Sequence, residues 1–273
     1  MNLNLSKVRK IAYAGVLIGL NVILNRLVGL AQAGPLFSFA RISPGISIVI
    51  FASLILGPFF GALVGVAGDA LGWVILGQWT GTFNFFLSVF YAIVGIVPYF
   101  VGKFLIPSPH KRVGRIIFFV LGFASVATAL LAVWLSPGIR TLFEKANFVV
   151  WIAQTVATVL VAMMGGVMVL AWALLNKKYQ KQAMLGGIQV DTIFSIIVVV
   201  EILGAILKPL AFIAFYSLIL GESFTARTGL DYGALVLINA LFATVNIPLN
   251  AFLLALYCRH GHFLLSGATN HER

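Results

Sequence analysis

Eight apolar runs divide this chain of 273 residues, and most of them are long enough to form a transmembrane helix. A helix needs roughly 17 to 25 mainly apolar residues to cross the hydrocarbon core of a bilayer. Hydrophobic residues make up 61% of the chain and charged residues 9%, too few to cover a soluble particle. The sequence therefore predicts an all-α integral membrane protein, a bundle of about eight transmembrane helices forming a single transmembrane domain. The expected spans are 11–30, 46–56, 59–76, 85–105, 113–135, 148–175, 192–220 and 233–258.

The distribution of basic residues predicts the topology. The net charge is +11, and the basic residues lie in short clusters between apolar runs, as expected for contacts with anionic lipid headgroups rather than nucleic acid. Most of them fall on one side when the spans alternate, which predicts a multi-pass protein of a bacterial or archaeal cytoplasmic membrane with both termini inside. That side holds Lys7, Arg9, Lys10, Lys103, Lys111, Arg112, Arg115, Lys177, Lys178, Lys181, Arg259 and Arg273.

Motifs for catalysis or nucleotide hydrolysis do not occur in the sequence. There is no GxxxxGK[ST] phosphate loop and no HExxH motif, and Cys258 is the single cysteine. We therefore expect no enzyme, no catalytic residue, no metal site and no cofactor. A membrane-embedded lipid enzyme is disfavoured because no clustered acidic metal site is found.

The third apolar run carries glycines at helical spacing. Gly61, Gly65, Gly68 and Gly72 recur at i, i+4, i+7 and i+11, which predicts one stripe that a neighbouring helix approaches closely. Asp69 directly follows Gly68 and therefore lies next to this stripe on the helix surface. An ionisable group at that depth costs on the order of 2.5 to 3.5 kcal/mol, so it needs a compensating partner.

Two further ionisable residues interrupt the seventh run. Glu201 and Lys208 lie seven residues apart, on one face of a helix, and Pro209 follows directly, which favours a local bend. Two interpretations stay open. Either the charges are neutralised by each other, by water or by Asp69, or Lys208 meets an anionic group of a ligand.

The predicted outer side offers further polar and aromatic residues. Arg26 and Arg41 flank a segment broken by Gly34 and Pro35, which we expect to form a loop over the outer side. Snorkelling explains arginines at such positions, and for Arg41 the capture of a carboxylate is the rival. Tryptophans there suit either an aromatic belt or a planar heterocyclic ligand. The predicted ligand-binding set is Arg41, Trp73, Gln78, Trp79, Asn84, Glu201 and Lys208.

Three asparagines in the eighth run, Asn239, Asn246 and Asn250, share one helix face. Their spacing of i, i+7 and i+11 predicts that the amides point into the bundle. Interhelical hydrogen bonds account for such a face, and a polar wall of a ligand pocket is the alternative.

The amino-terminal part resembles a known family. The segments RKIAYAGVLIGLNVIL and RISPGISIVIFASLILGPFFGALVGVAGDALG are similar to the substrate-binding S component of energy-coupling factor (ECF) vitamin transporters. The similarity covers residues 9–105 well and the rest only in general character. It rests on a basic start, a helix with small residues, a Gly-Pro turn and a third helix of the form GAxxGxxxDxxG. The residues that carry it are Ala12, Gly15, Gly19, Gly57, Pro58, Gly61, Gly65, Asp69 and Gly72.

The resemblance implies a non-enzymatic subunit that binds a vitamin and works with a transmembrane coupling subunit and ATPase subunits. It implies that Ala12, Gly15 and Gly19 pack against a partner helix. Members usually have six helices, so residues 1–105 and 192–258 would form the core, 106–191 an inserted helix pair and 259–273 a cytoplasmic tail. Arg41, Lys208 and the tryptophans favour a folate-like anionic aromatic vitamin, with riboflavin next. The alternative is a self-sufficient ion-coupled secondary transporter, in which Asp69 or Glu201 carries a proton.

Overall fold

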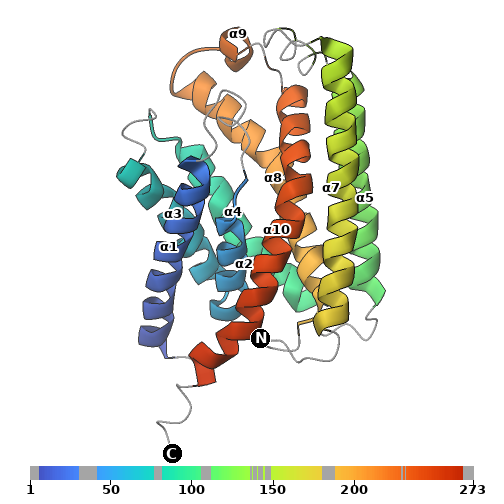
Figure 1. Ribbon diagram of the computed structural model, residues 1–273. Helices are drawn as coiled ribbons and strands as arrows, with labels where there is room; N and C mark the ends of the chain where they lie inside the picture. Colours follow the sequence, from blue (N-terminus) through green and yellow to red (C-terminus); the bar gives the residue numbers. More distant parts are fainter. Residues whose placement is uncertain are drawn as a thin grey trace, which may run out of the picture.

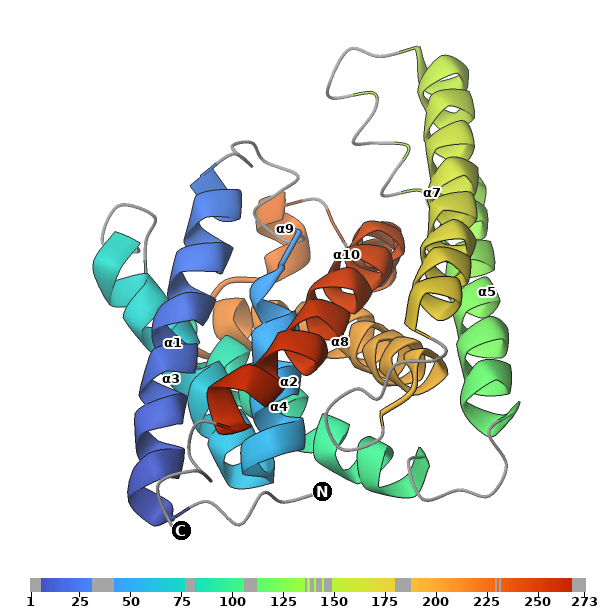
Figure 2. The ribbon, with the colours of Figure 1, turned by 60° about the horizontal axis from the view of Figure 1, so that its bottom comes forward.

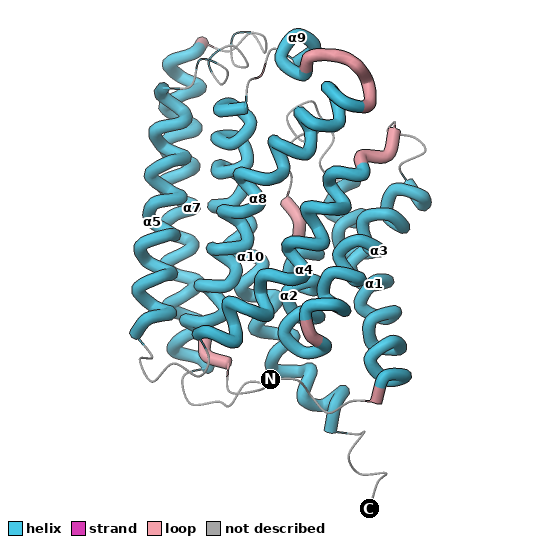
Figure 3. Tube along the Cα trace, turned by 180° about the vertical axis from the view of Figure 1, so that it is seen from behind, coloured by secondary structure: helices cyan, strands magenta, loops and turns pink. Residues whose placement is uncertain are grey.

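The computed structural model describes residues 6–30, 42–76, 82–105, 112–135, 137, 140, 144, 149–179, 188–228, 230 and 232–266. In this part of the chain all regular structure is helical, as Figure 3 shows. The predicted all-α fold is confirmed. The helices are α1 (Lys7–Leu30), α2 (Gly45–Leu56), α3 (Pro58–Leu76), α4 (Phe85–Leu105), α5 (Arg112–Leu135), α7 (Val150–Tyr179), α8 (Val190–Leu218), α9 (Phe224–Thr228) and α10 (Tyr232–Ser266).

Each predicted span corresponds to one helix. Seven of the described helices are long and apolar enough to cross a membrane, while α2 has only 12 residues. The sequence did not predict α9, which lies over the end of α8 and the start of α10 at the top of Figure 1. Phe224 of α9 is buried against Leu230 and Leu235, so this short helix closes an apolar cluster of its own. The chain is a multi-pass membrane protein.

The core lies around α2. Every residue of α2 is buried, and α1, α3, α4 and α10 all pack against it. Helix α8 completes the bundle through its contacts with α4 and α10. The short α2 is therefore enclosed by longer helices, which explains its nearly uninterrupted apolar sequence.

The glycine stripe of α3 forms the close packing that its spacing predicted. A Cβ on Gly61 would overlap backbone atoms of Gly95 in α4 and would lie 2.7 Å from Cα of Ser53 in α2. A Cβ on Gly65 would lie 2.5 Å from the carbonyl oxygen of Tyr91 in α4. The backbones of α3 and α4 touch here, which only glycine permits. Gly72 is also buried.

Helices α5 and α7 lie at one side of the bundle. They pack against each other, α8 and α10, and Figure 2 shows them on the side opposite α1. This is the pair that the sequence analysis proposed as an insertion between two parts of the core. The division of the chain at residues 106 and 191 stays a prediction.

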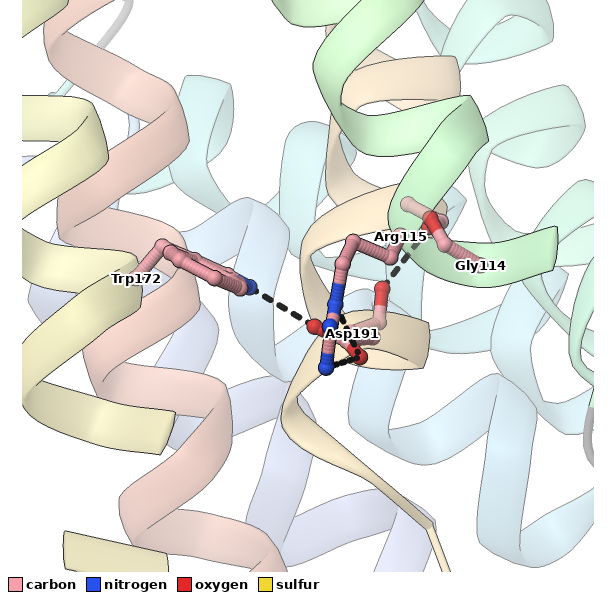
Figure 4. Close-up of polar contacts among 5 residues, drawn as sticks. Gly114, Arg115, Trp172 and Asp191 are labelled. Atoms are coloured by element: carbon pink, nitrogen blue, oxygen red, sulfur yellow. Dashed lines mark hydrogen bonds and ion pairs between the residues drawn. The ribbon is translucent and has the colours of Figure 1, made fainter. Parts of the chain in front are cut away.

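A polar junction joins this pair to α8 (Figure 4). The Asp191 carboxylate lies 3.2 Å from Nη2 of Arg115 and accepts a 2.7 Å hydrogen bond from Nε1 of Trp172. The guanidinium of Arg115 also lies 5.6 Å from the centre of the Trp172 ring. The hydroxyl of Ser195 donates to the carbonyl oxygens of Gly114 and Asp191. One buried carboxylate thus holds three helices together.

Helix α1 begins and helix α10 ends at the same end of the bundle (Figure 1). Lys7 at the start of α1 and Arg259 near the end of α10 lie there, as does the end of α7 with Lys177 and Lys178. The described basic residues at the start of α1 and near the ends of α7 and α10 therefore gather at one end, as the topology prediction requires. That this end is cytoplasmic stays a prediction.

Candidate functional site

A buried polar cluster lies between α8 and α10, inside an otherwise apolar bundle. Glu201 of α8 is 3% exposed. Its carboxylate accepts hydrogen bonds from the amides of Asn250, at 3.1 Å, and Asn246, at 3.5 Å. These two asparagines are one helical turn apart on α10, so the predicted face meets α8 as an interhelical contact. Asn239 differs, because its amide donates to the carbonyl of Leu235 within its own helix.

Lys208 completes the cluster from the same face of α8. Its side chain is buried, with 8% of the residue exposed. A Cβ on Gly204 would lie 3.7 Å from Cε and 3.8 Å from Nζ of this lysine, so the side chain passes over Gly204 toward Glu201. The ammonium lies 5.4 Å from the centre of the Phe90 ring on α4 and interacts electrostatically with Glu201. Among the described residues it forms no direct ion pair with a carboxylate.

The cluster is electrically balanced and keeps hydrogen-bonding capacity. Glu201 and Lys208 carry opposite charges, which answers the need for compensation at this depth. Oδ1 of Asn250 is buried and accepts no hydrogen bond from the described part of the chain. A buried acceptor without a donor is costly, so a molecule that brings a donor would be stabilised there.

The other charged candidate, Asp69, has a separate partner. The hydroxyl of Ser88 in α4 donates to Oδ2 of Asp69 at 2.7 Å, and Ser88 is buried. This bond joins α3 to α4 beside the glycine stripe. Of the compensations proposed for Asp69 and Lys208, the structure shows an electrostatic interaction of Lys208 with Glu201 and a hydrogen bond from Ser88 to Asp69.

The described candidates on the predicted outer side, Asn84 and Trp73, have contacts of their own. Asn84 caps α4, because its Oδ1 accepts from the N–H of Phe86. Its Nδ2 donates to the carbonyl of Ala211 in α8 at 3.4 Å. The Trp73 ring packs 5.4 Å from that of Phe83. The remaining candidates, Arg41, Gln78 and Trp79, lie outside the described residues.

The small residues of α1 face outward. Ala12, Gly15 and Gly19 are exposed, and a Cβ on either glycine would meet nothing within 4 Å. Large apolar residues flank them on the same helix, among them Ile11 and Val16. No described residue covers either glycine, and the pairing of this surface with a partner helix stays a prediction.

Sequence reasoning missed two polar features, the pair of asparagines in α1 and the carboxylate of Asp191. Asn21 and Asn25 of α1 hydrogen-bond to each other and to α3 and α2. They interrupt an apolar run at a spacing of i, i+4, and that signal could have identified them. Asp191 was missed because it follows a polar connection between two apolar runs, where a solvated carboxylate is expected. Phe90 carried no signal within its apolar run.

One comparison with known proteins gives a match. A family model described as "ECF-type riboflavin transporter, S component" matches residues 5–181, more than half of the chain. The match includes α5 and α7 and ends before α8. No curated protein and no solved structure matches the chain.

Proposed function

The chain belongs to the family of ECF-type riboflavin transporter S components, and on this premise we propose that it binds riboflavin at the polar cluster of α8 and α10. Membership makes it a substrate-binding subunit of a vitamin transporter rather than a member of an enzyme class. The choice of vitamin and of the site is our proposal. The observation that carries it is the buried, balanced pair of Glu201 and Lys208 inside an apolar bundle.

Charge balance supports riboflavin over a folate-like anion, the two vitamins that the sequence analysis considered. The preference for a folate-like anion rested on Arg41, Lys208 and the tryptophans, with Lys208 as the buried cation. Because Glu201 lies on the same face and interacts with that lysine, a dianionic ligand would meet a site without net charge. Riboflavin is uncharged at neutral pH and carries ribityl hydroxyls and ring N–H and C=O groups. Such groups suit the free acceptor of Asn250 and the nearby ring of Phe90.

We propose the exposed face of α1 as the contact with the transmembrane coupling subunit. Gly15 and Gly19 let a partner helix approach closely, and association in a bilayer depends on such packing. The helices α5 and α7 lie on the opposite side and leave this face open (Figure 2). The basic end of the bundle would then face the cytoplasm, where ATPase subunits act.

Thermal unfolding of the purified chain in detergent tests the ligand. Riboflavin at 100 times its dissociation constant should stabilise the protein by about 2.7 kcal/mol. Folate and thiamine serve as comparison vitamins. Stabilisation by folate and not by riboflavin would contradict the charge argument, and no response to any of the three would contradict a vitamin site.

Two variants test the site. Glu201→Gln and Lys208→Met should each weaken riboflavin binding at least tenfold, because each leaves one buried charge uncompensated. The double variant restores charge balance and should fold well but bind weakly. The matched control is Lys177→Met, at an exposed lysine at the end of α7, which should bind as the unmodified chain does. Unchanged affinity in both single variants would place the ligand elsewhere.

A further inference from the structure

The start of α2 is held from two sides by side-chain amides. The N–H of Ser43 donates to Oδ1 of Asn246 in α10 at 3.1 Å. The N–H of Gly45 donates to Oδ1 of Asn25 in α1, also at 3.1 Å. Pro44 stands between them and has no N–H. A helix start leaves such groups without a partner in its own helix, so here two other helices supply the acceptors.

Each of the two amides makes a second hydrogen bond on its far side. Nδ2 of Asn246 donates to Glu201 at 3.5 Å. Nδ2 of Asn25 donates to Oδ1 of Asn21 at 2.8 Å, and Nδ2 of Asn21 donates to the carbonyl of Val64 in α3 at 3.4 Å. A continuous series of hydrogen bonds therefore runs from α8 through α10 and the start of α2 to α1 and α3.

Two glycines make room for the amides in α1. A Cβ on Gly45 would overlap Oδ1 of Asn21 and the amide of Asn25, and a Cβ on Gly68 would overlap Nδ2 of Asn21. The amides thus lie directly on the backbones of α2 and α3. An interior packed this closely transmits a displacement instead of absorbing it.

We propose that Asn25 and Asn246 are positioning residues that clasp residues 43–45 and couple the Glu201 cluster to α1. The inference deepens the proposed function and rests on it, since that function makes the cluster the riboflavin site and α1 the partner face. The bond from Asn246 to Glu201 is long, and a ligand that bonds to Glu201 competes for the same oxygen. Loss of that bond releases Asn246 from Glu201. Asn246 then holds the N–H of Ser43 differently, and the bond between Gly45 and Asn25 of α1 changes with it.

Hydrogen exchange of two backbone amides tests the coupling. The full chain in detergent is labelled with ¹⁵N-serine and ¹⁵N-glycine, and exchange is measured at Ser43 and Gly45 by NMR. Asn246→Ala should speed exchange at Gly45 as well as at Ser43, although Gly45 bonds to α1. Asn25→Ala should likewise speed exchange at Ser43. The expected change is roughly tenfold or more at both amides, the effect of losing one hydrogen bond.

The matched control is Asn239→Ala, a buried asparagine of α10 whose amide bonds within its own helix. It should leave both amides unchanged. If each clasp variant speeds only its own amide, or if Asn239→Ala speeds both equally, the coupling is refuted. Should Asn246→Ala fail to fold, Asn246→Asp keeps an acceptor for Ser43, loses the donor to Glu201 and places a like charge there, so exchange at Gly45 should still become faster.

This measurement uses no vitamin. If riboflavin failed to bind, the proposed ligand would be overturned, while the exchange rates would still decide whether residues 43–45 are held as one unit. Coupled exchange at Ser43 and Gly45, together with riboflavin binding in the separate thermal unfolding test, supports both proposals.

Discussion

Replacement of Gly61 by alanine gives the sharpest test of the packing. The new Cβ would overlap the carbonyl group of Gly95 and lie 2.7 Å from Cα of Ser53. Both contacts involve backbone atoms, which have no rotamer that moves them away, so α3 must shift from α4 and α2. Overpacking a well-packed core costs about 1 to 3 kcal/mol. Alanine returns at most about 1 kcal/mol of helix propensity. We expect Gly61→Ala to lose about 1 to 2 kcal/mol of unfolding free energy.

The control is Gly15→Ala, on the exposed face of α1, where a Cβ meets nothing within 4 Å. This variant makes no clash and gains helix propensity of up to about 1 kcal/mol. The two alanine variants should therefore differ by about 2 kcal/mol, roughly thirtyfold in the unfolding equilibrium constant. Unfolding by sodium dodecyl sulfate in mixed micelles, followed by circular dichroism, measures both. If Gly61→Ala were as stable as Gly15→Ala, the backbone contact between α3 and α4 would be refuted.

Three further predictions concern the junction of α5, α7 and α8 and the face of α1. Arg115→Met removes the ion pair with Asp191 and should cost about 1 to 2 kcal/mol of stability. The cost is no larger because the arginine side chain is 47% exposed and the pair is partly screened. A double-mutant cycle with Asp191→Asn should be non-additive, and strict additivity would contradict the contact. Trp172→Phe keeps the ring and loses the N–H donor, so thermal unfolding should show a loss of about 1 kcal/mol, and no loss would mean that the bond contributes nothing. The double variant Gly15→Leu/Gly19→Leu should bind riboflavin normally and abolish uptake by cells with the complete transporter, whereas unchanged uptake would exclude this face of α1 as the partner contact.

Helix positions could be predicted from the sequence because the bilayer fixes the length and hydrophobicity of each span. The periodicity of the polar residues was equally informative, since Asn246 and Asn250 meet Glu201 as their shared face requires. Asn239 shares that face but bonds within its own helix, because an asparagine amide can reach the backbone carbonyl one turn earlier. Periodicity gives the face of a side chain and not its acceptor.

Long-range packing could not be predicted in the same way. An apolar helix surface looks the same in sequence whether lipid or protein covers it, so the position of α5 and α7 against α8 and α10 had no signal. The junction at Asp191 fixes that position, yet its members lie 76 and 19 residues from the carboxylate. Helix α9 was missed because five residues are too few to show a helical period.

This bundle contains two kinds of helix contact, one between backbones and one between polar side chains. Where α3 meets α4, glycines bring backbone onto backbone at Gly61 and Gly95, and such a contact has one arrangement. Where α8 meets α10, Glu201 is held by two amides and one buried acceptor lacks a donor. Hydrogen bonds of that kind exchange partners at low cost when a ligand offers better ones, because the groups remain satisfied. At the proposed vitamin site, α8 and α10 can therefore exchange hydrogen-bond partners while α3 and α4 stay in contact, and the bonds of Asn246 and Asn25 to residues 43–45 then carry the change to α1.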